Sequence, residues 1–353
     1  MKLISEYKTN RSRICMMGCI ADVFNNYGFH IEESTIFALS SGIRFYYKNF
    51  NDSENQLETK QIIMSSIEYD IVKIFNNISK VLKLQNEICC SIKEDEIKEF
   101  IDLNIEKKRP VISILSKKTL EYMKKRSRDD APHVANIIGC DFPENNIYIA
   151  DTYVPSVPIT TYSGLLSWDN YHEALLSAKD MFDKEYAFKC ITYLPLQDNP
   201  LDTLSQQDKI NLLKRTAEEY YDTQYIYGDF MYGQFALKHF IDDVKKWLSM
   251  DKTPILLNKF RSVSVQVSNY GGQYITNQLM AEYMGYLFET YGNSMYQSLR
   301  NDFGNLSKKW FIISNLLMKA SFGKSDEVKE NICNRLKYVF GLEDKIFQTL
   351  LKL

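Results

Sequence analysis

The chain of 353 residues is long enough for two domains, and its composition of 45% hydrophobic and 25% charged residues is that of an ordinary globular protein. Its formal net charge of −2 provides no global field that would favour nucleic acid or an anionic membrane, so we expect neither partner. No segment approaches the twenty apolar residues of a membrane-spanning helix, and the first residues lack the apolar core of a signal peptide.

The seven cysteines are odd in number and irregular in spacing, which does not indicate a disulfide framework. No Cys-x-x-Cys pair occurs, and the four histidines are widely scattered, so we expect neither a structural zinc site nor another metal site. Free thiols of this kind suit a reducing compartment, and we therefore expect a cytoplasmic protein.

The first hundred residues contain three segments with helical spacing of apolar residues or with helix-start signals: 15–27, 32–42 and 92–104. Gly28 and Gly42 end the first two. Ser91, with Glu94 three residues later, predicts a capping box for the third. The polar stretch 51–60 is expected to form a loop.

From Arg109 the pattern changes to short apolar runs rich in β-branched residues, which predict four strands: 110–115, 133–140, 146–151 and 187–194. Pro143-Glu144-Asn145 is typical of a turn and joins the second and third strands as a hairpin. The first part of the chain is therefore predicted to be an α+β domain with an antiparallel sheet.

After Pro200 the apolar residues recur at helical spacing, which predicts six helices: 204–221, 230–250, 274–291, 306–320, 326–340 and 343–353. The stretch Gln197-Asp198-Asn199-Pro200 has the composition of a linker. We therefore predict two domains, a catalytic one over residues 1–199 and an all-helical one over residues 200–353.

A candidate catalytic site emerges from Cys15, His133 and Asp151. A cysteine at a helix start lies near unpaired N–H groups that stabilise a thiolate, and Arg11 and Arg13 lie just upstream. The predicted hairpin brings Asp151 back toward His133, where a carboxylate can fix the imidazole tautomer that accepts the thiol proton.

Other acids and thiols leave alternatives open. Asp141 lies at the far end of the hairpin and is the poorer candidate, whereas Asp129 and Asp130 are close to His133 in sequence. Cys19, one turn after Cys15, is expected to pack in the core, and an inert, buried Cys15 is the simplest alternative to a reactive one.

These segments carry a resemblance to the papain-like fold of bacteriocin-processing leader peptidases and, more closely, to the butirosin biosynthesis protein H family. The resemblance covers most of the chain, and its motifs are the segments Cys15 to Gly28, Glu33, Phe37 to Gly42, Arg109-Pro110-Val111, Leu120-Glu121-Tyr122, His133 to Gly139, Tyr148 to Asp151, Gly233 to Leu237 running to Trp247, and Tyr270-Gly271-Gly272-Gln273.

The resemblance implies a papain-like cysteine acyltransferase that forms an amide in antibiotic biosynthesis. An acyl or peptidyl carrier protein would present the acyl group on phosphopantetheine, and a small amine would accept it, with no cofactor bound to the chain itself. Cys15 would be the nucleophile, His133 the general base and then acid, and Asp151 the orienting acid. The sequence leaves the oligomeric state open, a homodimer included.

Two positions depart from the related patterns. Ile14 stands where the family often has a histidine, and Thr9 stands where papain-like peptidases have the glutamine of the oxyanion hole. Asn10, beside Thr9, could donate the side-chain hydrogen bond in its place, together with the Cys15 backbone N–H. The basic stretch formed by Lys117-Lys118 and Lys124-Lys125-Arg126 is either a solvated face or a dock for an acidic carrier protein.

Two other functions compete with acyl transfer. A cysteine peptidase or amide hydrolase would use the same three residues and let water resolve the acyl-enzyme. A non-catalytic binding protein would keep the fold and lose the chemistry. The unusual oxyanion position is the reason to consider this alternative.

Overall fold

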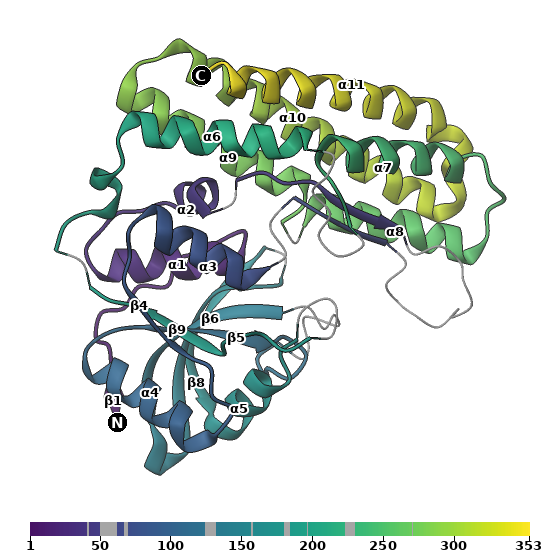
Figure 1. Cartoon of the computed structure of the whole chain (residues 1–353). Coiled ribbons are helices and arrows are strands. Elements are labelled where there is room, and N and C mark those ends of the chain that lie inside the picture. Colours follow the sequence, from purple (N-terminus) through teal and green to yellow (C-terminus); the bar gives the residue numbers. More distant parts are fainter. Residues whose placement is uncertain are drawn as a thin grey trace. The chain divides into compact units, whose positions relative to one another are not determined.

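The computed structural model describes residues 1–40, 42–49, 62–66, 70–123, 132–156, 158–179, 184–195, 197–222, 230–269 and 271–353. The chain folds into two compact units (Figure 1). The first unit comprises Met1–Ile36 and Tyr69–Leu204, and the second comprises Phe37–Glu68 and Ser205–Leu353. The units therefore change at residue 204, near the predicted boundary, but residues 37–68 belong with the later part of the chain.

The first unit is built on a seven-stranded sheet in which every pairing is antiparallel. The order is β4-β9-β5-β6-β7-β8, with β1 also pairing with β6. Its strands are β1 (Lys2–Leu3), β4 (Asn86–Cys89), β5 (Val111–Ser116), β6 (Pro132–Asp141), β7 (Asn146–Val154), β8 (Thr160–Ser167) and β9 (Cys190–Tyr193). The antiparallel sheet and the hairpin of β6 and β7 confirm the predicted fold class of this part, and β1, β4 and β8 are additions to it.

Four helices pack with this sheet: α1 (Cys15–Asn26), α3 (Ile71–Val81), α4 (Glu94–Glu106) and α5 (Trp168–Leu176). α1 contacts β6 and β7, while apolar side chains of α4 and α5 join the buried cluster on β5, β6 and β7. A short 3-10 turn, η1 (Phe142–Glu144), with Asn145 in the left-handed region, closes the hairpin as predicted for a turn. A second, η2 (Pro200–Thr203), ends the unit.

The predicted capping box of α4 was wrong. The helix begins at Glu94 with Lys93 as its N-cap residue, and no side chain caps it there. The Ser91 hydroxyl accepts the backbone N–H of Lys93 instead. Ser91 lies two residues before the N-cap residue, so its hydroxyl closes a local turn and does not cap the helix.

The second unit is mainly helical. α2 (Glu33–Ser40) leads into it, and its further helices are α6 (Gln206–Tyr221), α7 (Gly233–Trp247), α8 (Pro254–Ser268), α9 (Gln273–Tyr291), α10 (Ser294–Lys319) and α11 (Ser325–Leu351), with a kinked turn η3 (Ala320–Lys324) between the last two. Two predicted C-terminal helices are thus one helix. Buried Val339, Leu342 and Ile346 keep the helical spacing across Gly341, so nothing interrupts α11 there.

The helices from α6 to α11 confirm the predicted helical C-terminal part, and one short strand lies among them. β10 (Met231–Tyr232) pairs with β2 (Tyr46–Asn49), which pairs with β3 (Ile62–Ser65), and all these pairings are antiparallel. Two residues are too short a run for a strand pattern to show in the sequence. β10 exists because β2 offers it a partner, and this pairing ties residues 37–68 to the second unit.

A buried carboxyl group lies among the helices of the second unit. Glu343 on α11 accepts the Trp310 indole N–H at 3.0 Å and the Tyr220 hydroxyl at 3.1 Å. Burial raises the pKa of Glu343 to about 7, although both donors lower it, because burial disfavours the charged form.

The lengths and compositions of the helices show whether one of them could cross a membrane. Among the described residues, none of the helices combines the length and hydrophobicity needed to span a bilayer.

Candidate functional site

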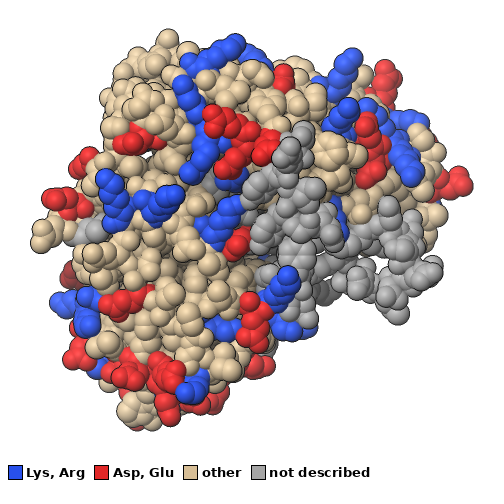
Figure 2. Space-filling view, in the orientation of Figure 1, with Lys and Arg blue, Asp and Glu red and all other residues tan. Residues whose placement is uncertain are grey.

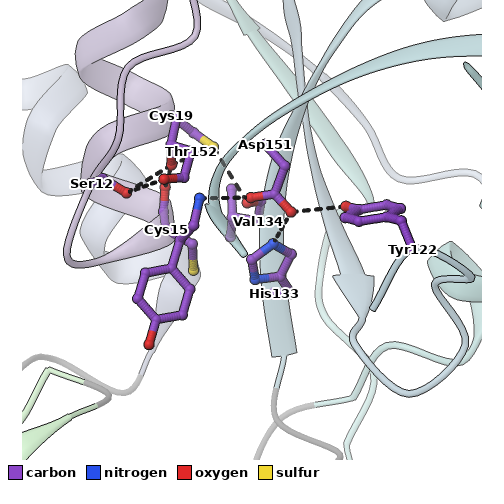
Figure 3. Close-up of polar contacts among 9 residues, drawn as sticks. Ser12, Cys15, Cys19, Tyr122, His133, Val134, Asp151 and Thr152 are labelled. Carbon is purple, nitrogen blue, oxygen red and sulfur yellow. Dashed lines mark hydrogen bonds and ion pairs between the residues drawn. The ribbon is translucent and has the colours of Figure 1, made fainter. Parts of the chain in front are cut away.

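Cys15 begins α1, and the strand β7 holds this helix start in place. The Thr152 hydroxyl donates to the Cys15 carbonyl oxygen at 3.2 Å and accepts the Ser12 hydroxyl at 2.8 Å. The Ser12 backbone N–H donates to the Thr152 carbonyl oxygen at 2.9 Å. Figure 3 shows these contacts on the α1 side of the site. The backbone that carries the candidate nucleophile is therefore fixed by residues from the predicted hairpin.

A carboxylate from elsewhere in the chain caps this helix. Ile14, the N-cap residue of α1, offers no side-chain hydrogen bond. Glu33 Oε1 instead accepts the backbone N–H groups of Ile14 at 2.7 Å and Arg13 at 2.9 Å. The Arg13 guanidinium also donates to Glu33, at 3.3 Å. The positive charge that we expected Arg13 to lend the thiolate is therefore paired with Glu33.

His133 and Asp151 meet as the hairpin predicted. Asn136 pairs with Ala150, so the antiparallel register places Asp151 opposite the second residue after His133, on the same face of the sheet. His133 Nε2 lies 2.8 Å from Asp151 Oδ2, and both residues are almost completely buried. The pair can hold one imidazole tautomer in one orientation.

The second ring nitrogen of His133 lies on the side of Cys15 (Figure 3). Burial by itself would raise the pKa of the Cys15 thiol, but the His133 imidazolium and a hydrogen bond from the Val134 backbone lower it below its usual value. Burial would likewise lower the pKa of His133, but the charges of Asp151 and Cys15 raise it to about 10. The two shifts favour a thiolate on Cys15 beside an imidazolium on His133, which are the nucleophile and the acid of acyl chemistry.

Asp151 has two further hydrogen-bond donors. The Tyr122 hydroxyl donates to Oδ2 at 2.8 Å, and the Tyr153 backbone N–H donates to Oδ1 at 2.9 Å. Burial raises the pKa of Tyr122 well above its usual value, and the charge of Asp151 raises it further. Tyr122 therefore remains a neutral donor at any ordinary pH.

Cys19 lies one turn beyond Cys15 and is fully buried. Its thiol donates to the Val134 carbonyl oxygen at 3.3 Å, and burial raises its pKa well above the usual value. A neutral thiol with a backbone partner is a packing residue, as the sequence predicted. The pKa values of the two thiols are therefore shifted in opposite directions although the cysteines share one helix.

The structure places Asn10 away from the role assigned to it. Its side-chain amide donates to Asp22 Oδ1 at 2.7 Å and its backbone N–H donates to Asp22 Oδ2 at 3.0 Å. Both residues line a cavity of about 970 Å³ that also touches Ser12, Arg13 and Gly18. The oxyanion role of Asn10 stays a prediction, and it would require the amide to turn toward Cys15.

Several other candidates can now be placed. Asp141 lies 3.5 Å from the N-terminal amino group, at the far end of the hairpin. The expected exposed basic stretch is wrong at Lys117, which is 3% exposed, although Lys118 is exposed. The predicted residues that lie outside the described ones are Ser41, the loop 51–60, Lys124, Lys125, Arg126, Asp129, Asp130 and Tyr270.

Charge of both signs is mixed over the surface that Figure 2 shows, with Lys and Arg beside Asp and Glu on both units. Within the described ranges, no cluster of three or more His, Cys, Asp or Glu side chains is arranged to hold a metal ion.

Three residues of the site were given no role by the sequence: Tyr122, Thr152 and Glu33. Tyr122 and Glu33 belong to motifs of the resemblance, so their presence was visible but their contacts were not. Thr152 directly follows Asp151, and its pairing with Ser12 joins residues 140 positions apart. No local pattern encodes a contact over that separation.

Comparison with known proteins supports the resemblance. Residues 14–152 match the family model described as butirosin biosynthesis protein H, N-terminal. The match begins one residue before Cys15, ends one residue after Asp151 and includes His133. No curated protein gave a match.

Proposed function

Since the chain belongs to the butirosin biosynthesis protein H family through residues 14–152, we propose that it is an amide-forming acyltransferase of natural-product biosynthesis. The observation that carries the proposal is the fully buried His133–Asp151 pair beside a Cys15 whose thiol pKa is lowered. A thiolate, an imidazolium and a carboxylate are the groups that acyl transfer through a thioester needs.

In the first half of the reaction, the Cys15 thiolate attacks the carbonyl carbon of a thioester on the phosphopantetheine arm of a carrier protein. The bond from that carbon to the donor sulfur breaks, and the departing thiolate takes the proton of the His133 imidazolium. The products are acyl-Cys15, a neutral His133 and the free thiol of the carrier.

In the second half, an amine attacks acyl-Cys15 and gives a proton to the neutral His133. The bond to Cys15 sulfur breaks, which releases the amide and restores the thiolate–imidazolium pair. Asp151 orients and stabilises the imidazolium. The backbone N–H of Cys15, at the start of α1, is the donor that we assign to the oxyanion.

The test is to trap the intermediate. Wild-type protein is incubated with an acylated carrier protein and its intact mass is recorded, with Cys15→Ala as the variant and Cys333→Ala as the matched control. We expect the acyl adduct on wild type and Cys333→Ala, and its loss in Cys15→Ala. Amide formation that survives Cys15→Ala would overturn the proposal.

Adding an amine separates transfer from hydrolysis. If the adduct decays to amide only when an amine is present, the chain is a transferase. If it decays equally fast to free acid without an amine, the chain is a hydrolase on the same site. A Cys15 that alkylates no faster than Cys333 would indicate a binding protein without this chemistry.

A further inference from the structure

Asp151 links two side chains of the site, because one of its carboxylate oxygens contacts both of them. Oδ2 lies 2.8 Å from both His133 Nε2 and the Tyr122 hydroxyl, while Oδ1 accepts the Tyr153 backbone N–H at 2.9 Å. Two donors on one carboxylate oxygen compete for the same negative charge. The hydroxyl therefore takes part of the charge that would otherwise act on the imidazole.

A second tyrosine, Tyr162, packs against the Tyr122 ring. Tyr162 lies directly opposite Asp151 in the pairing of β7 and β8. Its ring stacks on the Tyr122 ring with the centroids 4.2 Å apart and the planes within 5° of parallel. The Tyr162 hydroxyl donates to the Leu165 carbonyl oxygen at 2.8 Å and so takes no part in the Asp151 contacts. One ring supplies the hydroxyl and the other fixes its direction.

We propose that Tyr122 is a positioning residue of the Cys15–His133–Asp151 site, whose hydroxyl limits how tightly Asp151 holds the His133 imidazolium. Its role in turnover rests on the proposed acyl transfer, because His133 must give up its proton to the departing thiolate. Without the Tyr122 hydroxyl, the Asp151 carboxylate would stabilise the imidazolium more strongly, and the proton of His133 would be harder to release. Tyr122 thus makes His133 a better acid without touching the reacting atoms.

The pH profile of the site depends on the titratable groups around Asp151. They are Cys15 and Cys19 from α1, His133 from β6, Tyr162 from β8 and Tyr122 itself. Burial raises the pKa values of the Cys19 thiol and of both tyrosine hydroxyls above their usual values. Cys15, whose thiol pKa is lowered, and His133, whose pKa is about 10, are therefore the groups of this cluster whose titration the experiment follows.

The test is the pH profile of Cys15 alkylation by iodoacetamide, resolved by peptide mass mapping, in wild type, Tyr122→Phe and Tyr162→Phe. Each variant keeps its ring, but only Tyr122→Phe removes a donor from Asp151. We expect the high-pH inflection, where the imidazolium loses its proton, to move up by about half a pH unit or more in Tyr122→Phe. Tyr162→Phe should coincide with wild type.

A second variant changes the strength of the hydroxyl as a donor without deleting the hydroxyl. Site-specific 3-fluorotyrosine at position 122 keeps the ring and the hydroxyl but is a stronger donor, so the same inflection should move down. The proposal is overturned if the Tyr122→Phe inflection stays in place or moves down, if Tyr162→Phe shifts equally, or if fluorination moves it up. Alkylation needs no acyl donor, so failure of acyl transfer and failure of this proposal are separate results.

Discussion

The buried carboxyl of Glu343 gives a prediction whose size follows from the structure. Burial raises its pKa from 4.5 to about 7, so the folded chain keeps a proton that the unfolded chain releases. The contribution of this group to the free energy of unfolding is fully present below pH 4.5 and is lost as the pH rises through 7. A difference of this size corresponds to about 3 kcal/mol of unfolding free energy between pH 4.5 and pH 8.

Glu343→Gln removes the ionisation while its amide oxygen can still accept the Trp310 N–H. We expect the variant to gain about 3 kcal/mol over wild type at pH 8, and little or nothing at pH 4.5. Urea unfolding at both pH values measures this in a Trp168→Phe background, where Trp247 and Trp310, both in the second unit, report by fluorescence. Glu330→Gln, at an exposed position of the same helix, should follow wild type. Equal pH dependence in Glu343→Gln and wild type would refute the reasoning.

Three further outcomes concern the candidate site. His133→Ala should slow iodoacetamide alkylation of Cys15 at pH 7 by tenfold or more, on the order of one pKa unit, because burial then raises the thiol pKa without a compensating cation; an unchanged rate would show that the pair does not exist. Glu33→Ala leaves two backbone N–H groups of the α1 start without their acceptor and should cost about 1–3 kcal/mol in urea unfolding, whereas Glu33→Gln should recover part of it. Gly18→Ala should lower the thermal midpoint by several degrees, because its new Cβ would lie 2.2 Å from Ser12 Cβ, and a midpoint equal to wild type would contradict that packing.

The parts of the fold that the sequence predicted well are those with a local signal. Apolar residues at helical spacing and Gly28 predicted α1, and the β-branched runs on either side of Pro143-Glu144-Asn145 predicted the hairpin. The juxtaposition of His133 and Asp151 followed from the hairpin alone, because antiparallel register converts sequence spacing into position.

The parts that were missed depend on partners far along the chain or on signals that were present but unused. β10 is strand only because β2 lies beside it, and Glu33 caps α1 from another helix. α8 did carry a start signal, with Thr253 as its N-cap residue and Pro254 in its first turn, followed by buried apolar residues at helical spacing. The hydrogen bond from Tyr122 to Asp151 has no local signal in the sequence, because the two residues lie 29 positions apart.

The discontinuity of the second unit has a consequence for anyone who cuts this gene. A fragment that stops at Leu204 would carry residues 37–68 without the segment that completes their sheet. Phe45, Tyr46 and Tyr47, all nearly inaccessible to solvent in the whole chain, would then lose partners such as Phe240 and Tyr232. Such a fragment is expected to aggregate during expression. An isolated first unit would therefore need to be designed without residues 37–68.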